Sequence, residues 1–260
     1  MMIAQLTDFH VTVAGARVGE VDTRAAFERL VAHLAGLVPR PDLLLVSGDL
    51  AETGTEAEYA FVRAGLDRLG IAFSAVPGNH DLRGPMQAAL GSRTGQAAGH
   101  LGHVVEASGL AVIGLDTLVE GRGHGAIGAA QLDWLESVLA RHDGRPILIF
   151  MHHPPFETGI AAMDGIGLRD GRAELEELLA GRGDVAGILC GHVHRAVTGR
   201  FAGHRAFIAP SASHQFALDL DAPGAFRVVR ESPQIALHQI VGGALVSYLV
   251  PGPQDGAAAG

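Results

Sequence analysis

Short apolar runs alternate with amphipathic stretches over the first two thirds of this 260-residue chain. The runs at 3–7, 42–47, 71–76, 110–116, 146–151 and 185–190 are typical of buried strands. Apolar residues recur at helical spacing over 23–37, and further helices are predicted from about residue 55 and over 130–141 and 170–180. This alternation favours an α/β sandwich with a buried, largely parallel sheet component.

Two of the predicted helices have recognisable start signals. Asp22 precedes the first helix as a candidate N-cap, and Thr55 and Glu58 have the spacing of a capping box.

The pattern changes after Arg195. Short apolar runs separated by Gly, Pro and Asp turns follow, which is typical of antiparallel meanders. We expect one domain whose main part covers 1–215, with a C-terminal β extension and a flexible tail over 216–260 belonging to the same domain.

Composition narrows the classes of function. The formal charge is −9 and no basic block stands out, so nucleic acid is not an expected partner. No apolar run reaches the roughly 20 residues that span a bilayer, and the chain becomes polar by residue 8, so neither a membrane partner nor a signal sequence is expected. With the single cysteine, Cys190, these features predict a cytoplasmic protein.

Five of the apolar runs end in groups that can bind metal. The segments are Asp8-Phe9-His10, Gly48-Asp49, Asn79-His80-Asp81, His152-His153 and Gly191-His192-Val193-His194. Side chains at the carboxyl ends of strands point into the crevice where open α/β sheets bind ligands. Each segment alone is also compatible with a turn or a surface pair, but their joint occurrence in one α/β pattern predicts a metal site.

These five segments, in this order, resemble the pattern of the calcineurin-like metallophosphoesterase superfamily. The resemblance covers residues 6–195. It is closest to the class III cyclic-nucleotide phosphodiesterases and the bacterial glycerophosphodiesterases, on the segments VSGDL, PGNHD, FMHHPP and GHVH and on MDGIGLRDG. The segments GDLAETG and GNHD depart from the corresponding segments of protein Ser/Thr phosphatases, which argues against that branch of the superfamily. The resemblance implies a four-layer αββα sandwich, a catalytic domain over 1–215 and a phosphoesterase activity.

Carried over position by position, the resemblance implies two adjacent metal sites. The first ion would be held by Asp8, His10, Asp49 and His194. The second would be held by Asn79, His152, His192 and the same Asp49, which would bridge the two ions. A mixed nitrogen and oxygen donor set suits Fe, Mn, Zn or Co.

The implied reaction is hydrolysis of a phosphodiester by a metal-bound hydroxide. His80 would stabilise the phosphoryl group or protonate the leaving group, two roles that the sequence leaves open. Asp81 would support His80 or the adjacent backbone. His10, Asn79 and His194 would lie against the substrate as well as the metals.

His214 is a further candidate for substrate binding, because the glycerophosphodiesterases that this chain resembles have a histidine followed by glutamine at a similar place. An imidazole there would donate to the phosphate and could gain charge near neutral pH. The alternative is a surface histidine that begins a strand.

The expected function is metal-dependent hydrolysis of small diesters, either 3′,5′-cyclic nucleotides or glycerophosphodiesters. A phosphomonoesterase or nuclease of the same fold, or a catalytically silent scaffold, are the alternatives. The expected partner is the small-molecule substrate, together with a possible second copy of the chain in a homodimer or a higher homo-oligomer.

Overall fold

Two β-sheets lie face to face in the computed structural model, which describes residues 1–95, 99–220, 226–229 and 231–253. The first sheet has the order β15-β14-β1-β2-β3, with β1 Ile3–Leu6, β2 Leu43–Ser47, β3 Ala72–Val76, β14 Gln234–Val241 and β15 Ala244–Pro251. The second has the order β10-β11-β9-β7-β5-β4, with β4 His103–Ala107, β5 Leu110–Gly114, β7 Ile147–Phe150, β9 Val185–Cys190, β10 Val197–Phe201 and β11 His204–Ile208.

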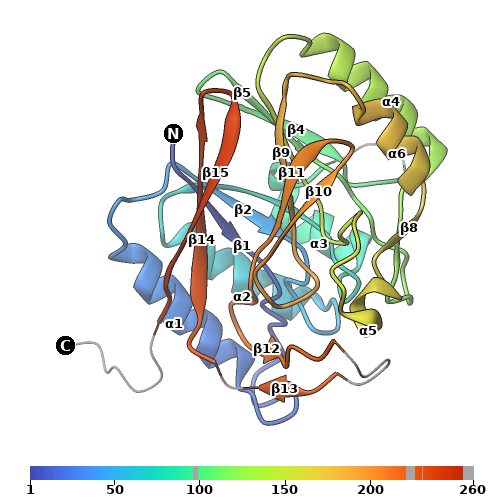
Figure 1. The fold of residues 1–260 in the computed structure, drawn as a ribbon. Helices are drawn as coiled ribbons and strands as arrows, with labels where there is room; N and C mark the ends of the chain where they lie inside the picture. Colours follow the sequence, from blue (N-terminus) through green and yellow to red (C-terminus); the bar gives the residue numbers. More distant parts are fainter. Residues whose placement is uncertain (96–98, 221–225, 230, 254–260) are drawn as a thin grey trace.

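Helices cover the outer face of each sheet. The first sheet packs against α1 Thr23–Ala35, α2 Glu56–Asp67 and α3 Arg83–Leu90, and the second against α4 Ala129–Arg141 and α6 Arg172–Leu179. In Figure 1, α1 lies on one side of the molecule, and α4 and α6 lie on the other. The four-layer αββα arrangement expected from the sequence is therefore confirmed.

The core has three apolar layers that follow from this arrangement. Phe27 and Tyr59 pack beneath the first sheet, and Leu135 and Leu175 pack beneath the second. Between the sheets lies a third cluster, to which both contribute: Ile3, Leu43, Leu45, Val76, Leu110, Val112, Leu148, Phe150, Leu189, Phe207, Ala209, Ala236 and Leu245. The central strands have both faces buried, which explains why they appear in the sequence as unbroken apolar runs.

The predicted helix starts are confirmed. The side chain of Asp22 accepts from the Ala25 backbone N–H at 2.9 Å, and Thr55 and Glu58 form the reciprocal capping box of α2. The first helix ends at Ala35, two residues before the predicted end, and its C-cap is Gly36.

The segments after Arg195 form hairpins, as predicted, but they do not pair only with one another. The β10–β11 hairpin extends the second sheet because β11 lies parallel to β9. The β14–β15 hairpin extends the first sheet, with His238 opposite Ile3 of β1. The boundary at residue 215 stays a prediction.

Several short elements had no clear sequence signal. They are β4, α3, the 3₁₀ turn Gly91–Arg93, α5 Ala161–Asp164, the pair β6 Gly125–Ala126 and β8 Leu168–Asp170, and the pair β12 Gln215–Phe216 and β13 Val228–Val229. The predicted flexible tail at 255–260 lies outside the described residues. Among the residues that are described, no helix has the length and apolar character needed to cross a membrane.

Candidate dinuclear metal centre

The carboxyl ends of five parallel strands meet at one edge of the two sheets. β1, β2 and β3 run parallel in the first sheet, and β7 and β9 run parallel in the second. Hydrogen bonds join the loops that follow: the Asp8 backbone N–H donates to Gly48 O at 3.0 Å, and Gly191 N–H to His152 O at 3.0 Å. All seven predicted metal ligands gather there: Asp8, His10, Asp49, Asn79, His152, His192 and His194.

The backbone is strained where the ligands sit. Positive φ occurs at seven non-glycine residues of the described chain, and five of them are predicted ligands: Asp8 at 54°, His10 at 47°, Asp49 at 51°, His192 at 73° and His194 at 60°. This left-handed region is uncommon for residues with a Cβ, and such residues cluster at functional sites where the surrounding structure holds them. The left-handed backbone at five of the seven candidate ligands supports a functional site at these positions.

One carboxylate oxygen, Asp49 Oδ2, lies between two groups of ligands. It is 3.5 Å from His10 Nε2 on one side and 3.4 Å from His152 Nε2 on the other. The other oxygen, Oδ1, accepts the backbone N–H of His80 at 2.9 Å, which fixes the orientation of the carboxylate. Asp49 thus has the geometry of a bridging ligand.

The first group consists of Asp8, His10 and His194. The two Nε2 atoms of the histidines are 3.1 Å apart, and Asp8 Oδ1 is 3.4 Å from His194 Nε2 and 4.0 Å from His10 Nε2. A metal with bonds of about 2.1 Å separates adjacent ligand atoms by roughly 3.0–3.4 Å in octahedral or tetrahedral geometry. The group therefore fits one ion, with the longest separation a little wide.

The second group consists of Asn79, His152 and His192. His152 Nε2 is 3.1 Å from Asn79 Oδ1 and 3.2 Å from His192 Nδ1. With Asp49 Oδ2 as the fourth member, this group also has the spacing of ligands around one ion.

The chemistry of the donors supports a cation in each group. His10 Nδ1 lies 2.8 Å from Glu52 Oε2, His194 Nδ1 lies 2.9 Å from His214 O, and His152 Nδ1 lies 2.8 Å from Ser47 O. Because these acceptors face each Nδ1, Nε2 is the nitrogen that each ring turns toward the site. Burial opposes protonation of His152, but Asp49 outweighs it and raises the pKa of His152 to about 9, so a metal bound to this Nε2 would displace a proton. His10 Nε2 and His194 Nε2 face each other across 3.1 Å, and two such nitrogens repel unless a cation lies between them. A proton or a metal ion can be that cation, so the donor set fits a metal.

The same packing sets the charges of the ligands. Burial opposes ionisation of Asp8, but the adjacent His194 outweighs burial and lowers the pKa of Asp8 to about 2. Burial also opposes ionisation of Asp49, and His152 outweighs it, so the pKa of Asp49 lies well below its usual range. Burial and the neighbouring His152 lower the pKa of His192 to about 3. Two carboxylates are thus ionised and His192 is neutral, which are the forms that bind metal.

His80 lies beside this centre and is more open to solvent than the metal ligands. Its side chain is 37% exposed, its ring stands edge-on to the ring of His10 with centroids 4.6 Å apart, and its Nδ1 lies 3.0 Å from Glu52 O. Burial opposes protonation of His80, but Asp49 and Glu52 outweigh it and raise its pKa.

The carboxylate of Asp81 is turned toward the backbone. It accepts from the backbone N–H groups of Gly78 at 2.8 Å, Leu50 at 3.3 Å and Ala51 at 3.2 Å, and from the Tyr59 hydroxyl at 3.0 Å. Asp81 therefore ties the loop after β3 to the loop after β2. The sequence left open whether Asp81 supports His80 or the adjacent backbone, and these hydrogen bonds are to the backbone.

Gly78 and Gly191 allow the ligand loops to approach one another. A Cβ on Gly78 would lie 2.2 Å from Asp49 Oδ1, and one on Gly191 would lie 2.1 Å from Thr7 Oγ1. Close approach of the backbone is a reason for glycine at such positions.

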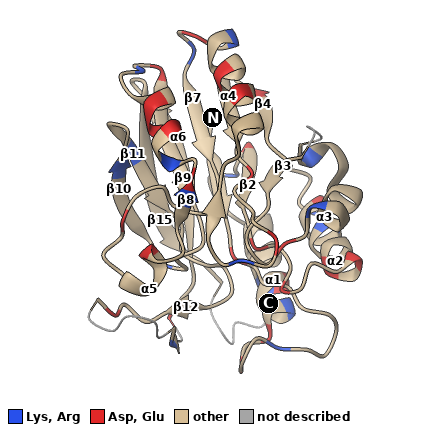
Figure 2. Cartoon of the chain, turned by 90° about the vertical axis from the view of Figure 1, so that its right-hand side faces the viewer, with Lys and Arg blue, Asp and Glu red and all other residues tan. Residues whose placement is uncertain are grey.

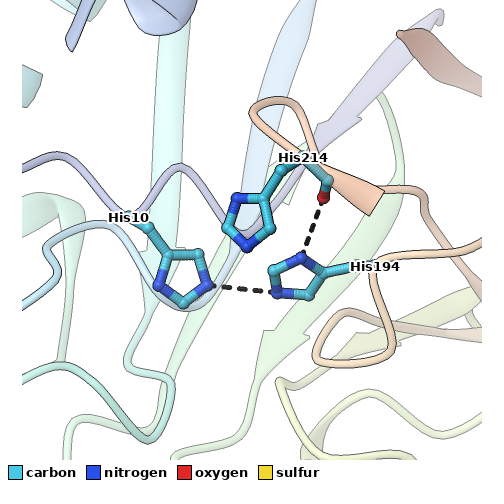
Figure 3. Close-up of side chains that lie close together, drawn as sticks. All are labelled: His10, His194 and His214. Atoms are coloured by element: carbon cyan, nitrogen blue, oxygen red, sulfur yellow. Dashed lines mark hydrogen bonds between the residues drawn. The ribbon is translucent and has the colours of Figure 1, made fainter. Parts of the chain in front are cut away.

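His214 lies against the first group of ligands, although it is far from that group in sequence. Its ring is 4.5 Å from that of His194 and 5.3 Å from that of His10, and Figure 3 shows the three imidazoles facing one another. Burial and the adjacent His194 and His10 lower the pKa of His214 to about 2. The expectation that His214 gains charge near neutral pH is therefore wrong, because burial among other imidazoles keeps the ring neutral.

Glu52 was missed by the sequence reasoning, and so was the role of the Ser47 carbonyl. Backbone carbonyls carry no residue-specific signal, and Glu52 belongs to none of the five segments. His153, the neighbour of a ligand, is buried with Nδ1 at 2.8 Å from Thr117 Oγ1 and Nε2 at 3.2 Å from Gly123 O. Both of its ring nitrogens thus face partners outside the ligand groups.

Comparison with known proteins gives the same family and the same fold. Residues 1–196 match the family described as calcineurin-like phosphoesterase. A probable glycerophosphodiester phosphodiesterase, GpdQ, from Arcobacter nitrofigilis is 33% identical over 240 residues, which are 92% of this chain and 88% of the relative. A 3′,5′-cyclic adenosine monophosphate phosphodiesterase, CpdA, from Pseudomonas aeruginosa is 32% identical over 232 residues, 86% of this chain and 83% of the relative.

A solved structure shares the architecture at low sequence identity. The dimetal phosphatase from Danio rerio superposes with a TM-score of 0.70 at 15% identity, covering 98% of this chain and 96% of the other. The family match over three quarters of the chain and the identity to full-length relatives give one conclusion: this protein is a member of the calcineurin-like phosphoesterase family.

Proposed function

We propose that this protein is a dinuclear metallophosphodiesterase that hydrolyses small phosphodiesters. The observation that carries the proposal is Asp49 Oδ2, which lies 3.5 Å and 3.4 Å from one histidine nitrogen of each ligand group. A single carboxylate oxygen shared in this way holds two ions close enough for a two-metal hydrolytic site, in which they lie about 3.5–4 Å apart.

In this proposal Asp8, His10 and His194 hold the first ion, Asn79, His152 and His192 hold the second, and Asp49 bridges them. Two such ions would supply Lewis-acid stabilisation of the phosphoryl oxygens and would activate the attacking water. The nitrogen and oxygen donors suit Fe, Mn, Zn or Co.

His80 acts on the substrate in this proposal. Its Nδ1 is occupied by the Glu52 carbonyl, so Nε2 is the atom left to donate to a phosphoryl oxygen or to protonate the leaving group. The raised pKa supports a protonated ring. Asp81 is a positioning residue that holds the His80 loop.

His214 contributes as a neutral donor. The Ser213 hydroxyl lies 3.0 Å from Asp8 O, to which it can donate, and 2.8 Å from His214 Nδ1. Because Asp8 O also accepts from the Ser211 hydroxyl, the Ser213 proton can go to Nδ1 instead, which would leave the ring proton of His214 on Nε2. An N–H beside His10 and His194 could then reach an outer oxygen of the substrate phosphate, alongside His10, Asn79 and His194 themselves.

The substrate class is supported by the names of the relatives. One is named for glycerophosphodiesters and the other for 3′,5′-cyclic adenosine monophosphate, and both are small diesters. Figure 2 shows that the charged residues of α4 and α6 are mainly acidic, with one arginine each, and the chain as a whole carries 28 acidic against 19 basic residues. This distribution supports a small substrate over nucleic acid.

The test is metal-dependent turnover with paired substrates. Metal-free protein should be inactive, and Mn²⁺, Fe²⁺, Zn²⁺ or Co²⁺ should restore hydrolysis of bis(p-nitrophenyl) phosphate in preference to the monoester p-nitrophenyl phosphate. Preference for the monoester would indicate a phosphomonoesterase. Absence of turnover with both ions bound would indicate a scaffold, and full activity without metal would end the proposal.

A further inference from the structure

Glu52 contacts two histidines that serve different purposes. Its carboxylate oxygen Oε2 lies 2.8 Å from His10 Nδ1 and 3.4 Å from His80 Nδ1, and its backbone oxygen lies 3.0 Å from His80 Nδ1. His10 belongs to the first ligand group, whereas His80 faces the substrate in the proposed function. One residue thus contacts the Nδ1 atoms of both rings.

The backbone fixes Glu52 at this place. The β1 and β2 strands end before it, but an isolated parallel bridge between Val11 and Ala51 continues their pairing. The Glu52 N–H donates to Val11 O at 3.0 Å, so the residue after His10 is tied directly to the residues around Glu52. The side chain is 25% exposed, which places the carboxylate at the rim of the site.

Glu52 differs from the groups that orient the other Nε2 ligands. His194 and His152 are held by the backbone carbonyls of His214 and Ser47, whereas His10 is held by a carboxylate. A carboxylate that accepts the N–H of a ligating imidazole fixes its tautomer and makes the other nitrogen a stronger ligand.

We propose that Glu52 is a positioning residue with two effects. It sets the affinity of the site for the first metal ion by orienting His10, and it orients the His80 ring toward the substrate phosphate. The inference rests on the proposed function, because it assumes that His10 binds an ion and that His80 meets the substrate. It concerns a residue outside the five sequence segments.

The experiment measures metal binding apart from activity. Metal-free protein is titrated with Mn²⁺ by calorimetry and equilibrium dialysis for the parent, Glu52→Ala, Glu52→Gln and the control Glu56→Ala. Glu56 is exposed and lies four residues away, so its substitution removes the same charge without touching either histidine. Circular dichroism confirms that each variant is folded.

Glu52→Ala should weaken one of the two Mn²⁺ sites by about 10–100-fold, the usual effect of removing a partner of a ligating histidine. The other site should change little, because Asn79, His152 and His192 do not contact Glu52 in the hydrogen bonds of the described chain. The Mn²⁺ affinity of Glu52→Gln should lie between those of the parent and Glu52→Ala, since the amide oxygen of the glutamine still accepts from His10 Nδ1. Glu56→Ala should bind Mn²⁺ as the parent does.

A double-mutant cycle with His80→Ala tests whether Glu52 affects turnover through His80. Glu52→Ala should lower kcat at saturating Mn²⁺ in the parent, and it should lower kcat less in the His80→Ala background, while the loss of Mn²⁺ affinity persists in both. Two sites of parental affinity in Glu52→Ala would overturn the inference about His10, and equal kcat effects in both backgrounds would overturn the inference about His80. A parent protein that binds no Mn²⁺ would instead overturn the proposed function.

Discussion

Asp49 shows how much a single residue decides at this centre. One of its oxygens faces both ligand groups, and the other is fixed by the backbone of His80. Each of the other candidate ligands belongs to one group, whereas Asp49 Oδ2 faces both. The two proposed ions therefore depend on each other through this one residue.

Replacing Asp49 by Ala should remove both ions together. We expect the affinity of each site to fall by more than the 10–100-fold that is typical for the loss of an outer partner, since the proposed function makes Asp49 a direct ligand of both ions. Metal content after dialysis, measured by inductively coupled plasma mass spectrometry, checks this. Asp133→Ala, at an exposed position on α4, is the control that should keep two ions. Two ions in Asp49→Ala would contradict the bridging assignment.

His80 should separate catalysis from metal binding. We expect His80→Ala to lower kcat by about 10²–10⁴-fold, the usual contribution of a general acid, and to keep both ions, because the His80 ring is not a member of either ligand group. Steady-state kinetics and metal analysis on the same sample provide the measurement. His204→Ala, at the start of β11, should retain the parental kcat. An unchanged kcat in His80→Ala would exclude His80 from the reaction.

At the scale of elements, the loop that carries Asn79 and His80 is held at both sides. Asp81 ties it to the loop after β2, and α3 begins immediately afterwards at Arg83. The guanidinium of Arg83 donates twice to the buried Asp116, at 2.7 Å and 2.9 Å. This ion pair joins α3 to the end of β5, so it fixes one side of the loop against the second sheet.

Arg83→Ala should destabilise the fold and disturb the loop. Among the described residues, removing the arginine leaves the buried Asp116 carboxylate with the Leu101 and Leu118 backbone N–H groups as its partners. We expect a loss of about 2–3 kcal/mol in the free energy of unfolding, less than for a fully buried pair because the arginine is 28% exposed. Urea denaturation measures it.

Arg83→Lys should also be destabilised, because lysine cannot make the paired contact. The control is Arg145→Ala, whose surface pair with Glu106 should contribute below about 1 kcal/mol. Equal stability of Arg83→Ala and Arg145→Ala would contradict the anchoring role.

At the scale of the whole molecule, the centre depends on how the two sheets pack. The first sheet supplies Asp8, His10, Asp49 and Asn79 from the ends of its parallel strands, and the second supplies His152, His192 and His194. Chain segments that follow different sheets therefore meet in each ligand group. His238 has a related position in the interior, since it lies on β14 and contacts Ser247 and Gln5 at 2.8 Å and 3.1 Å.

His238 should make the protein sensitive to acid. Burial lowers its pKa to about 3, whereas the unfolded chain takes up a proton near pH 6.5. The unfolded state therefore binds more protons between these values, and stability falls as the pH decreases from 6.5 toward 3 by about 1.4 kcal/mol per pH unit. By this measure His238 destabilises the folded state by about 2 kcal/mol at pH 5 relative to pH 7.5.

The check is a comparison of the parent with His238→Gln, which keeps a donor and an acceptor for Gln5 and Ser247. Urea denaturation at pH 7.5 and pH 5 should show a smaller loss for the variant. Other titrating groups are shared by both proteins and cancel in the difference. Equal losses of stability in the parent and the variant would show that the pKa of His238 is the same in the folded and unfolded states, and would contradict this prediction.

The sequence by itself determined the longer strands and helices and the set of candidate ligands. Short unbroken apolar runs alternating with helical patterns favoured central strands, and the polar groups that followed the runs were expected at the carboxyl edge of a parallel sheet. The helix caps at Asp22 and Thr55 could also be predicted from the sequence, because a cap depends on residues three positions apart.

The tertiary structure decided what depends on contacts distant in sequence. The β14 strand pairs with β1 across more than 200 residues, and no local pattern specifies that partner. Glu52 reaches His10 only because the loops after β1 and β2 are bridged, and His214 is kept neutral only because folding buries it between His10 and His194. Periodicity and motif spacing report local geometry, whereas charge state and the orientation of rings are set by neighbours that only the packed chain brings together.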